Sequence, residues 1–186
     1  DEGADGGVRF DVVATAGDRR LGGDDVDELL ARHIWVGDWK ASEHREFVTQ
    51  CRRAKEELCG DGGDEGSSDA TGVVETTVAL RGETINITRR ELDAAIQALI
   101  DRAEHVIDDA LSALESRRNS RLIHEVVLVG GSTRIPAIRS MLRRKFPPPV
   151  PPELCTSISA ETAVAQGLAI QAALASGAVP LWELRN

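Results

Sequence analysis

The longest regular pattern in this 186-residue sequence is a helical repeat that begins after residue 88 and runs for about 28 residues. Apolar side chains recur in it at every third or fourth position: Leu92, Ile96, Leu99, Ala103, Ile107, Ala110 and Leu114. The start, Thr88-Arg89-Arg90-Glu91, fits a capping box. At 1.5 Å per residue this helix is about 42 Å long, which exceeds the needs of one small domain. We therefore predict a rod that joins two subdomains.

The other predicted elements are short and mix helices with strands. Strands are expected over residues 8–15, 73–80, 84–88 and 124–129, the last buried on both faces. Helices are expected over about 24–34, 42–58 and 134–146, and from 159–161 to near Gly177. We interpret residues 60–72 as a surface loop and the proline-rich residues 147–152 as a stiff linker.

The composition excludes several classes of function. The chain has 22 basic and 31 acidic residues, a formal net charge of −9, which argues against general nucleic-acid binding. No apolar run approaches the roughly 20 residues that span a bilayer, and the polar start is unlike a signal peptide. Cys51, Cys59 and Cys155 form no metal-binding pattern, so reduced thiols are expected. We expect a cytoplasmic protein that engages neither nucleic acid nor membrane.

The best local candidate for a site is the turn Gly130-Gly131-Ser132-Thr133, between a predicted strand and a predicted helix. Glycines after a strand let a ligand approach the backbone closely, and the free N–H groups of a helix start favour anions or polar ligand edges. Such a turn also occurs as a plain tight turn without a ligand. Taken alone, the pattern leaves both readings open.

Four segments together resemble the seventy-kilodalton heat-shock chaperones. They occur in the family's order and cover nearly the whole chain: Ala14–Asp27, Cys51–Lys55, Val127–Pro136 and Ile158–Gly167. The resemblance implies an α/β chain with the actin-like ATPase fold, of which this sequence is similar to the second lobe. Residues 1–23 and 118–186 would form an inner α/β subdomain with a partial mixed sheet. Residues 24–117 would form an outer α+β subdomain.

In that family this lobe binds the adenosine of ATP or ADP. Carried over, the resemblance implies that Lys55 hydrogen-bonds the ribose and that the Arg134 guanidinium stacks on adenine. The full set of implied nucleotide-binding residues is Gly22, Gly23, Lys55, Gly131, Ser132, Arg134 and Glu161. A plain surface lysine at position 55 and a helix-capping arginine at position 134 are the competing interpretations.

Three positions depart from the family pattern. Arg52 stands where a glutamate normally accepts a ribose hydrogen bond, Glu56 where an arginine normally flanks the base, and Cys59 where a serine normally bonds adenine. Each lost contact could weaken binding by about 1–3 kcal/mol. These departures support an alternative function, a chaperone-like interaction or regulatory module without nucleotide binding. The two glycine motifs together argue against a third option, an actin-like sugar kinase.

The resemblance also implies that ATP hydrolysis needs groups from outside this chain. The phosphate loops, catalytic lysine and Mg-coordinating aspartates of the family lie outside these residues, so we predict no ATPase activity from the chain alone, and a Mg ion only with the first lobe. We expect the sheet to close by direct re-pairing of strands 8–15 and 126–129, or by contact with another copy. Expected partners are a nucleotide-exchange factor at the outer subdomain and, for a full-length parent, a J-domain co-chaperone and unfolded polypeptide.

Overall fold

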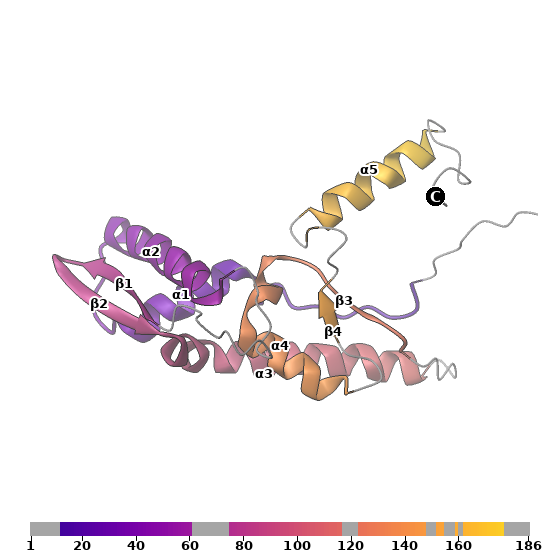
Figure 1. The fold of residues 1–186 in the computed structure, drawn as a ribbon, viewed down its shortest axis with the longest axis horizontal. Coiled ribbons are helices and arrows are strands. Elements are labelled where there is room, and N and C mark those ends of the chain that lie inside the picture. Colours follow the sequence, from indigo (N-terminus) through magenta and orange to yellow (C-terminus); the bar gives the residue numbers. More distant parts are fainter. Residues whose placement is uncertain are drawn as a thin grey trace, which may run out of the picture.

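The computed structural model describes residues 12–60, 75–116, 123–147, 152–154, 159 and 162–176. Figure 1 shows an elongated arrangement in which one long helix, α3 (Arg89–Ser116), runs beneath the other elements. Two helices and a hairpin gather at its start: α1 (Gly23–Ile34), α2 (Ala41–Cys59), β1 (Glu75–Leu80) and β2 (Glu83–Thr88). The remaining elements lie beyond them: β3 (Val126–Leu128), the 3-10 turn η1 (Gly131–Arg134), α4 (Pro136–Lys145), β4 (Pro152–Leu154) and α5 (Ala163–Ala175).

Most of the core lies where α1, α2 and the hairpin meet the first half of α3. Its largest fully buried side chains include Leu30, Phe47, Leu58, Ile87 and Leu92. These residues come from four elements and repeat at helical or strand spacing, because each element buries one face. Burial raises the pKa of the Cys51 thiol, also in this core, to about 12. Cys51 is therefore a packed, unreactive thiol at neutral pH.

The hairpin and the helix that follows it form as the sequence predicts. β1 and β2 pair antiparallel, with Val78 opposite Ile85. Arg81 and Gly82 have φ angles of 53° and 85°, the left-handed conformations of the tight turn that suits twisted strands. At the start of α3, Glu91 Oε2 accepts from Thr88 N at 2.7 Å, and Thr88 Oγ1 accepts from Glu91 N at 3.2 Å. The predicted capping box is confirmed.

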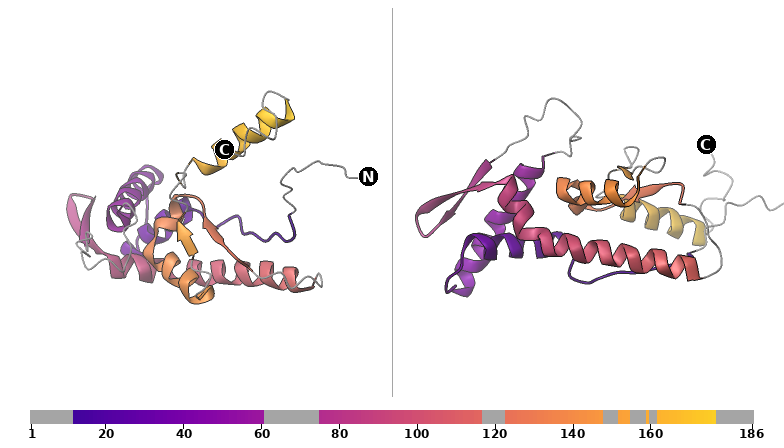
Figure 2. Two further views of the ribbon diagram at one scale, coloured as in Figure 1. Left: turned by 45° about the vertical axis from the view of Figure 1, so that its right-hand side comes forward. Right: turned by 90° about the horizontal axis from the view of Figure 1, so that it is seen from below.

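The rod-like helix α3 contacts both groups of elements. Its first half packs against α1 and β2, and its second half packs against α4. Lys145, at the end of α4, forms ion pairs with Asp108 and Glu104 of α3, the latter at 3.6 Å. Arg102 of α3 forms an ion pair with Asp18, which ties the segment before α1 to the rod. The right-hand view of Figure 2 shows α3 extending along the molecule beside α4.

The second sheet differs from the expectation of a strand buried on both faces. β3 pairs in parallel with β4, with Leu128 opposite Leu154. Leu128 is buried, but the alternate residues Val127 and Val129 are 54% and 41% exposed. A strand is buried on both faces only when other elements cover both, and in the described structure only the Leu128 face is covered. Pro152, expected in a linker, is the first residue of β4, a position that proline tolerates in strands.

The strand expected over residues 8–15 is not found in its described part. Residues 12–15 are irregular, and residues 8–11 lie outside the described residues. The described strands form only two pairs, β1 with β2 and the parallel β3 with β4, so neither a mixed sheet nor re-pairing with residues 8–15 is seen. Alternating apolar residues favour a strand, but pairing also needs a neighbour in register, which sequence periodicity does not specify.

Helices α4 and α5 contrast in their surroundings. α4 begins with Pro136 in its first turn, as predicted, and buries Met141 and Leu142. α5 carries no charged side chain, and its Val164, Leu168 and Ile170 are 61%, 65% and 46% exposed. Figure 1 shows α5 standing away from the other helices.

Within the described ranges, no helix combines the length and apolar character needed to cross a bilayer. The expected helix end at Gly177 and the predicted loop beyond Gly60 lie outside the described residues.

An aromatic cluster lies at the connection between α1 and α2. Trp39 lies 6.2 Å from Trp35 and 5.2 Å from both His44 and Phe47, measured between ring centroids. The Arg81 guanidinium lies over the Trp35 ring at 5.3 Å from its centroid. These contacts fix the connection between α1 and α2 against the hairpin turn, since aromatic pairs and cation–π contacts add to the area that they bury.

Candidate functional site

A pocket of about 680 Å³ lies between the start of α1, the second half of α2 and the turn η1. This volume falls within the roughly 300–1,000 Å³ that is typical of small-molecule sites. Its walls combine backbone-rich turns with charged side chains. The lining residues are Gly23, Asp24, Asp27, Arg52, Lys55, Glu56, Cys59, Gly60, Gly131, Ser132, Arg134 and Ile135.

Gly23 is the point at which the two walls of the pocket approach each other. A Cβ atom on Gly23 would lie 3.3 Å from Ser132 Oγ and 3.4 Å from Lys55 Nζ. The Lys55 ammonium also donates to the Gly23 carbonyl at 3.3 Å. A side chain at this position would therefore touch both walls, and the Ser132 hydroxyl would have to shift by a few tenths of an ångström to make room for it.

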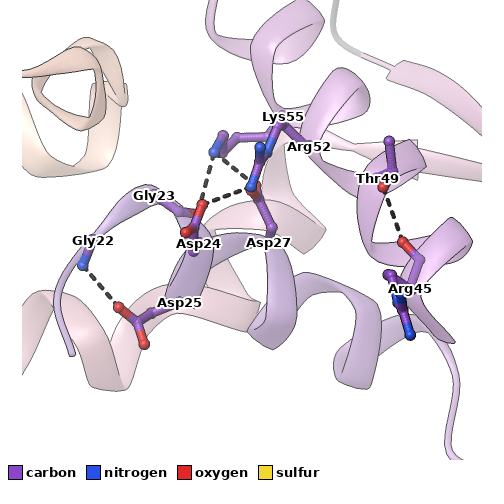
Figure 3. Close-up of polar contacts among 9 residues, drawn as sticks. All are labelled: Gly22, Gly23, Asp24, Asp25, Asp27, Arg45, Thr49, Arg52 and Lys55. Atoms are coloured by element: carbon purple, nitrogen blue, oxygen red, sulfur yellow. Dashed lines mark hydrogen bonds and ion pairs between the residues drawn. The ribbon is translucent and has the colours of Figure 1, made fainter. Parts of the chain in front are cut away.

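A buried carboxylate organises the charged wall (Figure 3). Asp27 of α1 is fully buried, and its two oxygens lie 2.6 Å from Lys55 Nζ and 2.9 Å from Arg52 Nε. Lys55 and Arg52 are three residues apart, so they lie on one face of α2 and reach the same partner. Because Asp27 is removed from water, these contacts are stronger than surface ion pairs and fix both cations.

Arg52 makes a second ion pair at the rim of the pocket. Its Nη2 lies 2.6 Å from Asp24 Oδ1, in the first turn of α1. The Asp24 side chain is 91% exposed, whereas the Arg52 side chain is 48% exposed. The pKa of Arg52 is raised, first by its hydrogen bond to Asp27 and further by the charges of Asp27 and Asp24. Arg52 therefore stays charged and bridges two carboxylates of α1.

The opposite wall is the glycine turn that joins β3 to α4. Gly130 has a φ of 93°, a conformation that L side chains rarely adopt. Thr133 Oγ1 donates to the Gly130 carbonyl at 2.7 Å, and Arg139 Nε donates to the Thr133 carbonyl at 3.0 Å. These bonds hold the turn so that Gly131, Ser132 and Arg134 line the pocket.

The structure brings most of the predicted residues together. Gly23, Lys55, Gly131, Ser132 and Arg134 all line the pocket. Gly22 lies just outside the lining, where its N–H donates to Asp25 Oδ2 at 2.9 Å and caps α1. Glu161 lies outside the described residues. The surface-lysine interpretation of Lys55 is wrong, since its side chain is only 12% exposed and paired with Asp27.

The three atypical residues line the same pocket. Arg52, Glu56 and Cys59 all contribute to its α2 wall, so they would meet any ligand bound there. Burial raises the pKa of the Cys59 thiol, which therefore stays protonated at neutral pH. A protonated thiol is only a weak hydrogen-bond donor and acceptor.

Sequence reasoning missed Asp27 and Asp24. A signal was present for Asp27, because it shares a helix face with Leu30 and Ile34, which belong to the apolar stripe of α1. A carboxylate on a buried face needs a cationic partner.

Among the described residues, no group of three or more potential metal ligands comes together.

The fold and the pocket together define a class of protein. Among the described residues, helices and two small sheets place a glycine turn and a helix start around a polar pocket, an arrangement found in α/β proteins. A family model described as "Hsp70 protein" matches residues 4–185. The chain belongs to the Hsp70 family, as its motifs predict.

Individual relatives agree with this assignment. The chain is 33% identical over 183 residues to "Heat shock cognate 70 kDa protein 3" of Dictyostelium discoideum, covering 93% of this chain and 27% of that protein. It is 34% identical over 183 residues to "Chaperone protein dnaK" of Trieres chinensis, covering 91% and 28%. It is 32% identical over 178 residues to "Chaperone protein HscA homolog" of Shewanella putrefaciens, covering 92% and 26%. The chain thus spans about a quarter of the length of these relatives.

Proposed function

We propose that this chain forms the adenosine-binding half of the ATPase domain of a heat-shock-seventy-type chaperone. The observation that carries the proposal is the convergence of Gly23, Lys55, Gly131, Ser132 and Arg134 on one pocket. These residues come from segments distant in the sequence, and the family resemblance assigns all of them to adenosine. Gly22 and Glu161 complete the proposed set.

The residues present fit a nucleoside. Gly131 lines the pocket, and apart from its chain neighbours no atom of the described residues lies within 4 Å of the place where its Cβ would stand, so space beside this backbone is open. Ser132 and Lys55 offer polar groups for the sugar, and the planar Arg134 guanidinium can stack on a base. When bound, the nucleotide supplies the phosphoryl groups for hydrolysis. The roles of these residues are to bind and orient its adenosine end.

The proposed parent function is ATP-driven folding of unfolded polypeptide in the cytoplasm. In this proposal the chain alone does not hydrolyse ATP, because the first lobe supplies the phosphate-binding groups and the residues that coordinate the Mg ion. A nucleotide-exchange factor would contact the outer subdomain, proposed as residues 24–117. A J-domain co-chaperone and the polypeptide client would engage the full-length parent.

A second candidate function is an interaction or regulatory module that does not bind nucleotide. The observation that favours it is that Arg52, Glu56 and Cys59 all line the pocket. In this alternative, the ion pairs of Asp27 stabilise the fold and serve no ligand.

Calorimetric titration of the 186-residue chain with ADP and with adenosine distinguishes the two functions. We expect binding at millimolar concentrations or tighter, and a loss of about 10-fold or more in Arg134→Ala, which removes the stacking group. Arg45→Ala, an exposed arginine of α2 outside the pocket, is the matched control and should bind like the wild type. If a folded wild-type sample, verified by circular dichroism, binds neither ligand, the adenosine half-site is refuted and the module function is supported.

A further inference from the structure

The two edges of the β1–β2 hairpin differ in how they are covered. Figure 1 shows the hairpin at one end of the molecule, with β1 beside α2. On that side, the outward N–H of Ala79 in β1 donates to Gln50 Oε1 of α2 at 2.7 Å. β2 forms the opposite edge of this two-stranded sheet. A strand edge that nothing covers presents N–H and C=O groups that can pair with another chain.

The groups that β2 presents on its outer edge follow from the strand geometry. Thr88 N–H points away from β1, since it donates to Glu91 Oε2 at the start of α3. Backbone groups alternate in direction along a strand of an antiparallel pair, so those of Asn86 and Thr84 also point outward. Among the described residues, the backbone N–H and C=O of Thr84 and Asn86 have no hydrogen-bond partner.

β2 also lacks the usual protection of an open edge. Its sequence, residues 83–88, contains neither lysine nor proline, and its register with β1 runs without a bulge. Ile85, between the two open positions, is only partly buried, so an added strand could cover it. β3 and β4 have three residues each, too few to offer a comparable edge.

The charges beside this edge favour a basic partner. Glu83 lies exposed at the turn end of the open stretch, and the Glu91 carboxylate closes the other end at Thr88. Exposed Arg90, in the first turn of α3, offsets the charge of Glu91, so a cation is expected beside Glu83 above all. A second copy would bring the same carboxylate and a further formal charge of −9, which opposes self-pairing.

We propose that the outer edge of β2 is a docking site for an extended, basic segment of a partner protein, which adds to the hairpin as a third strand. Main-chain hydrogen bonds to Thr84 and Asn86 supply the affinity. An apolar side chain over Ile85 and a lysine or arginine beside Glu83 supply the specificity. The inference goes beyond the proposed adenosine-binding function and does not depend on it, because no residue of this edge lines the pocket.

The test titrates the isotope-labelled 186-residue chain with the peptide Lys-Thr-Ile-Thr-Val-Thr-Lys and follows backbone amides by NMR. This peptide alternates apolar and polar residues and carries a cation at each end. We expect saturable shifts at Thr84 and Asn86, with a dissociation constant on the order of 1 mM for a few backbone bonds. The same peptide N-methylated at its threonines lacks the required donors and should bind about 10-fold more weakly or worse.

Variants of the chain separate backbone pairing from side-chain contacts. Asn86→Pro removes an outward N–H that serves no bond to β1, so the hairpin should form while peptide binding falls about 10-fold. Asn86→Ser keeps that N–H and is the matched control, which should bind like the wild type. Glu83→Gln should weaken binding about 3-fold at low salt. Circular dichroism verifies folding, and the N-methylated peptide tests the pairing even if Asn86→Pro does not fold.

Four results overturn the inference. The first is a wild-type spectrum in which millimolar peptide shifts neither Thr84 nor Asn86. The second is equal binding of the N-methylated peptide, which excludes backbone pairing. The third is equal binding of Glu-Thr-Ile-Thr-Val-Thr-Glu, which excludes selection of a basic partner. The fourth is a shift of the two amides with protein concentration alone, which assigns the edge to a second copy.

Discussion

At the scale of single residues, Asp27 connects stability to the proposed site. Its carboxylate is fully buried and neutralises two cations from α2, one of which, Lys55, is itself largely buried. Removing one partner of a buried ion pair leaves a charge without compensation, which costs more than the pair contributes. The residue that shapes the pocket wall thus also links α1 to α2.

We predict that Asp27→Asn lowers the free energy of unfolding by about 3 kcal/mol, because Lys55 keeps its charge and loses its buried counter-ion. Chemical denaturation with urea, followed by circular dichroism at pH 7, measures the change. Asp24→Asn, which alters an ion pair at the exposed rim, should leave the urea midpoint close to that of the wild type. If the two substitutions shift the urea midpoint equally, burial does not make the Asp27 ion pairs more important for stability than the exposed Asp24 pair.

Individual residues also show how much of the site can be predicted from the sequence. Motif resemblance identified Gly23, Lys55, Gly131, Ser132 and Arg134, and these residues meet in one pocket. It did not identify Asp27 or Asp24, because their partners are about 25 residues away and an ion pair depends on how two helices face each other. The depth at which Lys55 is buried also follows from that packing rather than from local sequence.

At the scale of secondary-structure elements, the sequence predicts helices better than it predicts the pairing and burial of strands. α1, α2 and α3 were predictable because their apolar repeats and the capping box at Thr88 act within a few residues. β3 was expected to be buried on both faces, yet Val127 is exposed, since burial depends on which elements cover a strand. The parallel partner of β3 was not predicted, because it begins at Pro152, the last residue of the predicted linker, and has only three residues.

The capping box of α3 makes part of the folding stability depend on acidic pH. Hydrogen bonds from the Thr88 backbone and side chain lower the pKa of Glu91 below its ordinary value of 4.5. The folded state therefore favours the charged form. This contribution to stability is complete above the unfolded-state pKa and is lost as pH falls through the lowered folded-state pKa.

We predict that Glu91→Gln reduces the drop in stability between pH 6 and pH 3. The wild type loses the charged capping bond on acidification, and the variant has no charge to lose. Urea midpoints at both pH values give the comparison. Glu46→Gln, at an exposed position of α2, is the control and should show the full wild-type drop. If the urea midpoint of Glu91→Gln falls between pH 6 and pH 3 as much as that of the wild type, the capping charge is not the source of the drop.

At the scale of the whole molecule, buried contacts are unevenly distributed. α2 buries Phe47, Cys51, Ala54 and Leu58, and it packs against α1 and the hairpin. α5 is largely exposed, and none of its described side chains is buried. Local opening costs least where few apolar contacts must be broken. Among the described residues, those around the first half of α3 are therefore expected to open least readily.

We predict that backbone amides of α2 exchange with solvent deuterium about 100-fold more slowly than those of α5. Hydrogen-exchange mass spectrometry at neutral pH, with peptides covering each helix, measures the difference. α4 provides an internal reference and should be intermediate, because it buries only Met141, Leu142 and Arg139 while packing against α3. Protection of α5 equal to that of α2 would show that α5 is covered in solution.

The aromatic cluster gives this molecule a localised optical signal. The chain has three tryptophans and no tyrosine, and Trp35 and Trp39 lie in edge contact at the hairpin end. Their emission is therefore sensitive to the contacts with His44 and Arg81, and it reports the connection between α1 and α2. Trp182 also emits, so the variant Trp182→Phe isolates the signal of Trp35 and Trp39, and events at the Gly131 turn require a separate chromophore.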